Sequence, residues 1–136
     1  MKRSALGLAA CGVVVLSALP AWAGTYLDRA SLLLSAADEE LGYLRKKGSD
    51  LDLARLIHRV AQARLAAASE MSVPPEVVQA HPHLLLLLEN CERAANAVLE
   101  KRNEHFLKFL RLAREEEELF RAVLRHLGWV LPRPKD

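Results

Sequence analysis

Hydrophobic residues recur three and four positions apart between Tyr26 and Lys47, a spacing that predicts an amphipathic helix over this range. The recurring residues are Leu27, Ala30, Leu34, Ala37, Leu41 and Leu44. Thr25 is expected to cap the start of the helix, and the basic run 45–47 followed by Gly48 favours its end.

A second helix is predicted directly after Gly48, with Ser49 or Asp50 as its N-cap. Its inward face is predicted to consist of Leu53, Leu56, Ile57, Val60, Ala63 and Ala67. Because only Gly48 and Ser49 separate the two helices, we expect them to fold back on each other as an antiparallel hairpin.

The segment from Met71 to His81 interrupts the helical pattern, because Val73-Pro74-Pro75 cannot continue a helix. A third helix is predicted to begin at Pro82. Five consecutive leucines make its first turns apolar on every side, so this stretch is either surrounded within the fold or offered to a partner. The candidate interaction residues are Leu84, Leu85, Leu87 and Leu88.

Six polar residues run from Glu100 to His105 without Gly or Pro. A turn around Asn103 gives four helices of similar length, whereas a continuous helix gives a hairpin plus one rod from Pro82 to Leu127. The similar lengths favour an all-α, four-helix up-down bundle over residues 24–131, followed by a tail at 132–136. The last helix is predicted to end at Gly128 and to turn inward Phe106, Phe109, Leu110, Ala113, Phe120, Val123, Leu124 and Leu127.

The first 23 residues resemble a signal peptide in their layout. Lys2 and Arg3 precede an apolar run, and the sequence Ala21-Trp22-Ala23 has the small residues that a signal peptidase cuts after. This predicts export to the periplasm or secretion, with Gly24 as the mature N-terminus. Two alternatives remain: a lipid-modified Cys11, and an uncleaved membrane anchor, since residues 4–27 carry no charge.

The composition fits one folded domain, because 51% of the 136 residues are hydrophobic and only two are cysteines. Removing Lys2 and Arg3 with the signal peptide leaves 17 basic and 17 acidic residues. The mature domain therefore has no basic surplus of the kind that favours nucleic acid, and no membrane span is expected after cleavage.

Histidine is the residue type with which a metal or haem site would be built, and the chain has five. The motifs Glu-x-x-His, His-Glu-x-x-His and Cys-x-x-Cys-His do not occur in the sequence. His81, His83 and His126 are the remaining metal candidates, and they define the alternative function of a metal- or haem-binding bundle. The main interpretation assigns no cofactor.

Three further residues of chemical interest are predicted to lie in or near the core. Cys91 is the only thiol left after signal cleavage, and its spacing predicts a buried apolar role, with a reactive thiol or an intermolecular disulfide as the alternative. Glu117 falls on the inward stripe of the last helix, where a carboxylate needs a partner. We expect it to pair with Arg64 in the core.

The sequence contains no arrangement typical of a catalytic nucleophile with its base and orienting group, so we do not expect an enzyme. The leading interpretation is an exported, non-catalytic helical bundle that acts as an interaction module. Its partner is expected to be another protein or a second copy of the same chain.

Overall fold

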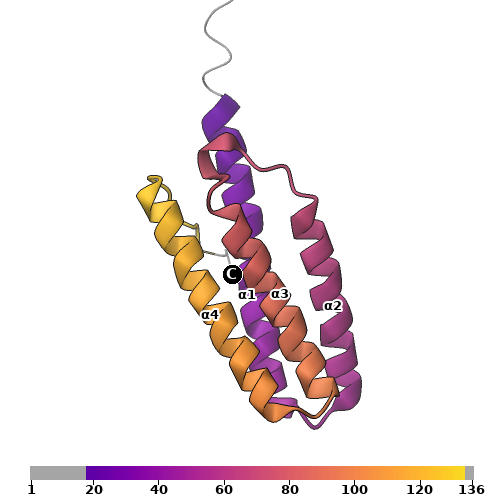
Figure 1. The fold of residues 1–136 in the computed structure, drawn as a ribbon. Helices are drawn as coiled ribbons and strands as arrows, with labels where there is room; N and C mark the ends of the chain where they lie inside the picture. Colours follow the sequence, from indigo (N-terminus) through magenta and orange to yellow (C-terminus); the bar gives the residue numbers. More distant parts are fainter. Residues whose placement is uncertain (1–17, 134–136) are drawn as a thin grey trace, which may run out of the picture.

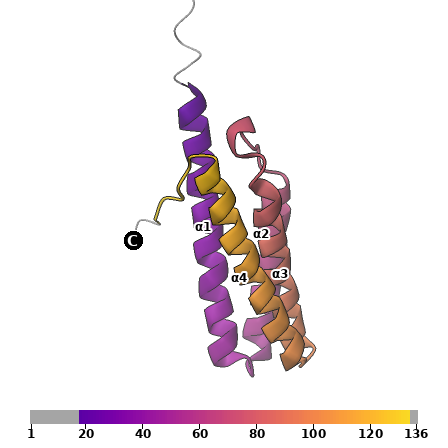
Figure 2. The same ribbon diagram turned by 60° about the vertical axis from the view of Figure 1, so that its left-hand side comes forward.

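The computed structural model describes residues 18–133, and this part of the chain is helical without strands. The helices are α1 (Ala18–Lys47), α2 (Leu51–Ser69), the short 3-10 helix η1 (Pro75–Val77), α3 (His81–Leu99) and α4 (Asn103–His126). Successive long helices run in opposite directions, which gives a four-helix bundle with η1 at one end (Figure 1; Figure 2). The predicted all-α bundle is confirmed.

Helix α3 is the centre of the bundle and contacts each of the other three long helices. This position explains its apolar start, because Leu84, Leu87 and Leu88 are buried and Leu85 is half-buried. Only Leu86 of the leucine run is exposed. The prediction of an interaction surface at 84, 85, 87 and 88 is therefore wrong: these side chains are occupied by contacts within the fold.

The turn between α3 and α4 forms where the polar run predicted it, and the alternative of one helix over 82–127 is wrong. Lys101 adopts the left-handed conformation with φ of 57°. The Arg102 N–H donates to the Ala97 carbonyl at 2.9 Å, and the Lys101 N–H donates to the Val98 carbonyl at 3.0 Å. These two bonds form a Schellman motif, which ends α3 without glycine or proline.

Helix α1 begins earlier than expected, at Ala18 instead of Tyr26. Thr25 lies inside the helix and does not cap it, and Pro20 is accommodated because the first turn needs no N–H donor for an intrahelical bond. Of the predicted signal peptide, residues 1–17, including Cys11, lie outside the described residues. In the part from 18 to 133, no helix has both the length and the hydropathy needed to cross a bilayer.

Helix α2 follows a short connection and starts at the predicted place. The Asp50 carboxylate accepts the Leu53 N–H at 3.1 Å and so acts as the N-cap, while Ser49 does not. Gly48 is required in this connection, because a Cβ at this position would lie 2.9 Å from the Leu44 carbonyl oxygen.

The face that α2 buries differs from the predicted one. The buried residues are Ala54, Ile57, Ala61, Arg64 and Ala68, whereas Leu56, Val60, Ala63 and Ala67 are exposed. The three alanines at 54, 61 and 68 recur every seven residues, and small side chains allow neighbouring helices to approach closely. Packing of this alanine face rotates the larger Leu56 and Val60 out of the core.

Helix α4 buries Phe106, Leu110, Ala113, Phe120 and Leu124, as predicted, whereas Phe109, Val123 and Leu127 are half-buried. The helix ends at His126, with Gly128 next to its C-cap as expected. The chain then returns to α1, where the Ser31 hydroxyl donates to the Pro132 carbonyl at 2.7 Å. The first residues of the predicted tail are thus part of the packed structure, and 134–136 lie outside the described residues.

Candidate functional site

The three metal candidates do not form a common site. His81 Nδ1 lies 2.9 Å from the Tyr26 hydroxyl, His83 Nδ1 lies 2.8 Å from Glu116 Oε2, and His126 is exposed. Within the described residues 18–133, no three side chains of His, Cys, Asp or Glu are grouped so that they could hold a metal ion. The described residues therefore do not bring the three candidates His81, His83 and His126 together as one metal site.

Histidine instead connects α3 to each of its neighbours. His81 bonds to Tyr26 of α1, and His83 bonds to Glu116 of α4. A third contact joins His58 Nε2 of α2 to Glu92 Oε1 of α3 at 2.6 Å. These pairs are 33 to 55 residues apart in the sequence, so no local spacing signalled them.

The environment of His81 favours the neutral imidazole. Burial lowers the pKa of His81, and a hydrogen bond to the backbone of Ala68 partly opposes this effect. Burial also raises the pKa of the Tyr26 hydroxyl, which keeps it protonated. A neutral histidine can accept from the Tyr26 hydroxyl through Nδ1 while its other ring nitrogen donates, so both groups are satisfied.

Arg64 forms the most buried ion pair of the described chain, with Glu40 of α1. Its Nη1 and Nη2 atoms donate to the two carboxylate oxygens at 2.8 and 2.5 Å. Glu117 instead pairs with Arg121 one turn along α4. The predicted Glu117–Arg64 pair is therefore wrong, because Glu40 approaches Arg64 across the α1–α2 hairpin.

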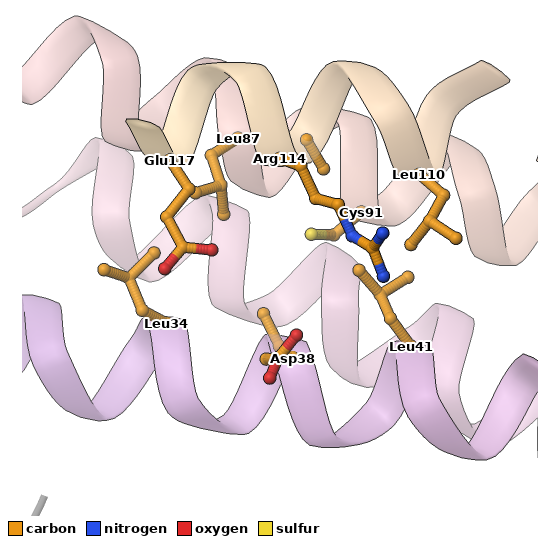
Figure 3. Close-up of a pocket in the computed structure, with 10 residues that line it drawn as sticks. Leu34, Asp38, Leu41, Leu87, Cys91, Leu110, Arg114 and Glu117 are labelled. Carbon is orange, nitrogen blue, oxygen red and sulfur yellow. The ribbon is translucent and has the colours of Figure 1, made fainter. Parts of the chain in front are cut away.

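Cys91 of α3 is a buried free thiol. It lines a cavity of about 20 Å³ together with residues of α1 and α4 (Figure 3). Such a volume accommodates about one water molecule. Burial raises the pKa of Cys91 to about 12; the nearby Arg64 opposes this, and the carboxylates of Glu40, Glu117 and Asp38 add to it. The thiol therefore stays protonated and is a poor nucleophile, which agrees with the predicted apolar role.

A shallow groove between α1 and α4 is covered at one end by the returning tail. It has a volume of about 250 Å³ and is lined by Ser31, Leu34, Ser35, Asp38, Glu117, Arg121, Leu131, Pro132 and Arg133. The two acidic and two basic side chains in this lining balance one another in charge. Glu117 and Arg121 already form an ion pair with each other. We therefore interpret the groove as the boundary between α1 and α4, which residues 131–133 partly fill.

The largest exposed apolar side chains of α1 and α2 occupy the side of the hairpin that faces away from α3. They are Leu32 (62% exposed), Tyr43 (45%), Leu56 (59%) and Val60 (38%). Helical periodicity places these four on the sides of α1 and α2 that point away from the buried residues of each helix. We call these four residues the α1–α2 face.

Comparison with protein-family models, with curated proteins and with solved structures finds no match to this chain.

Proposed function

We propose that the chain is an exported interaction module that binds a protein partner through the α1–α2 face. The observation that carries the proposal is the exposure of Leu56 and Val60, one turn apart on α2, together with that of Tyr43 on α1. Exposed apolar side chains that gather on one side of a helix pair are typical of surfaces that a partner covers. Scattered single leucines would carry no such argument.

The polar residues support a binding role over a catalytic one. Arg64, His58, His81 and His83 each bond to a side chain on another helix, and Cys91 is buried with a raised pKa. Each of these groups has a structural task in holding the bundle together. The rigid scaffold they create is suited to presenting a fixed surface.

The proposed export rests on the sequence of residues 1–23, whose charged start, apolar run and Ala-Trp-Ala ending fit a signal peptide. Mass spectrometry of the protein from its native host checks this part separately. We expect a mature chain that starts at Gly24. A chain that retains Met1 contradicts the cleavage but leaves the binding face unaffected.

A photoreactive amino acid at position 56 tests the binding face in the native host. We expect covalent capture of a protein partner when the probe replaces Leu56, and no capture when it replaces Leu107, an exposed leucine on α4. Equal capture from both positions, or none from position 56, contradicts the proposal.

A further inference from the structure

We propose that the partner of the α1–α2 face is a second copy of this chain, docked so that the two α2 helices lie antiparallel about a two-fold axis. This inference rests on the proposed function and adds the identity and the orientation of the partner. It follows from two properties of the exposed side of α2: the order of side-chain sizes along it and the position of its charges.

The exposed apolar residues of α2 are graded in size along the helix. Leu56 lies in the first half and Val60 at the middle, and Ala63 and Ala67 continue the same stripe in the second half. An antiparallel partner centred between Val60 and Ala63 sets Leu56 against Ala67 of the other copy, and Val60 against Ala63. Each large side chain then meets a small one, which is the complementarity that close helix packing requires.

One pair of opposite charges beside this stripe, Arg55 and Glu70, comes together in the same alignment, with Asp52 next to Arg55 on its own helix. Arg55 lies at the start of α2 and Glu70 at its C-cap, and both are exposed. In the antiparallel arrangement, Arg55 of one copy lies opposite position 68 of the other copy. Glu70 is two residues further along that helix, an offset of about 3 Å at 1.5 Å per residue. The two-fold axis generates this Arg55–Glu70 contact twice. Arg55 also bonds to Asp52 in its own helix, which leaves its guanidinium further donors.

Helix α1 fits the same axis. Because Glu40 faces Arg64 across the antiparallel hairpin, Tyr43 is level with Ala61, close to the centre of the α2 stripe. An axis at this level brings the two copies of Tyr43 together and places Glu39 of one copy near Lys46 of the other. Glu39 and Lys46 are both exposed and carry opposite charge. The surface is therefore self-complementary on both of its helices, a property that an isologous dimer needs.

Light scattering and sedimentation of the purified protein test the proposal. We expect a mass of two chains, and we expect Val60→Glu to give a single chain with unchanged helical content. Leu107→Glu, at an exposed leucine outside the face, is the matched control and should remain a dimer. A protein that is monomeric at its highest soluble concentration overturns the proposal, as does a dimer that both substitutions leave intact.

A charge exchange tests the antiparallel orientation without disturbing the apolar residues. Glu39→Lys and Lys46→Glu should each weaken dimerisation by about tenfold, because each places like charges opposite one another. The double variant should restore the wild-type dissociation constant. Additive weakening in the double variant overturns the orientation.

The outcomes separate this inference from the proposed function. If position 56 captures a different protein while the purified chain remains monomeric, the proposed dimer is wrong, but the proposal that the α1–α2 face binds a partner is supported. If position 56 captures nothing and the chain remains monomeric, both proposals fail.

Discussion

Tyr26 and His81 are 55 residues apart in the sequence, yet the Tyr26 hydroxyl and His81 Nδ1 lie 2.9 Å apart. The contact ties α1 to the first residue of α3, and the hydrogen bond from His81 to the backbone of Ala68 adds the end of α2. Three helices thus meet at one neutral imidazole. The rings of Tyr26 and His81 also pack edge to face, with centroids 5.7 Å apart.

The position of His81 predicts a loss of stability in acid. Its pKa is lowered in the folded protein by burial, so the unfolded chain binds the proton more readily. The contribution of His81 is fully present above its usual pKa of about 6.5 and decreases as the pH falls below that value. Urea unfolding between pH 8 and pH 5 measures this decrease.

His81→Asn isolates the effect from the other titrating groups. Asparagine preserves an acceptor for the Tyr26 hydroxyl but does not titrate. We expect the wild type to be more stable than this variant at pH 8, and the difference to shrink toward pH 5. A difference that stays constant over this range assigns the acid sensitivity to other residues.

The Arg64–Glu40 pair predicts an asymmetry between single and double substitutions. Glu40→Ala leaves the buried guanidinium without its carboxylate and should cost about 3 kcal/mol of unfolding free energy. Replacing both residues, as Arg64→Met with Glu40→Leu, removes the charge together with its partner and should recover most of that loss. The three free energies come from urea unfolding, and a double variant as unstable as Glu40→Ala contradicts the argument.

Lys101 predicts a stabilising substitution. A lysine in the left-handed conformation is strained by about 1 kcal/mol relative to glycine, which adopts this conformation freely. Lys101→Gly should therefore raise the unfolding free energy by about 1 kcal/mol, whereas Lys101→Ala, which keeps a Cβ, should not. Thermal or urea unfolding of the two variants decides this. A loss of stability in Lys101→Gly contradicts the Schellman geometry of the α3–α4 turn.

Cys91 predicts slow reaction with thiol reagents. The Cys91 sulfur is buried and the pKa of Cys91 is raised to about 12, so this residue offers neither an accessible thiol nor a thiolate at neutral pH. In a Cys11→Ala chain, the rate at which a disulfide reagent labels Cys91 should therefore follow unfolding as urea is added. Complete labelling within seconds in native buffer contradicts this placement.

The fold was predictable because its elements are specified locally. The stripe in residues 26–47, the Pro-Pro break at 74 and 75, and the polar run 100–105 each identify a helix or its end by composition within a few turns. The turn at Lys101 lacked the usual glycine, yet the six polar residues around it were sufficient to indicate it.

The contacts between helices were not predictable in the same way. Several stripes can be drawn on α2, and the one with the larger residues was the natural choice from the sequence, but the alanines at 54, 61 and 68 form the packed face. The partner of Arg64 depends on how α1 and α2 rotate against each other, so the sequence does not identify Glu40 and predicts Glu117 in its place. The same dependence hid the three histidine contacts, which join residues from different helices.

Both proposals depend on the rotation of α2, because this rotation exposes the α1–α2 face and buries Arg64. Labelling of Leu56→Cys and Ile57→Cys in a background with both Cys11→Ala and Cys91→Ala tests it directly, at a protein concentration low enough to dissociate any assembly. We expect the thiol at position 56 to react at the rate of a free thiol and the thiol at position 57 to react only upon unfolding. Rapid reaction at position 57 with protection at position 56 contradicts this rotation of α2.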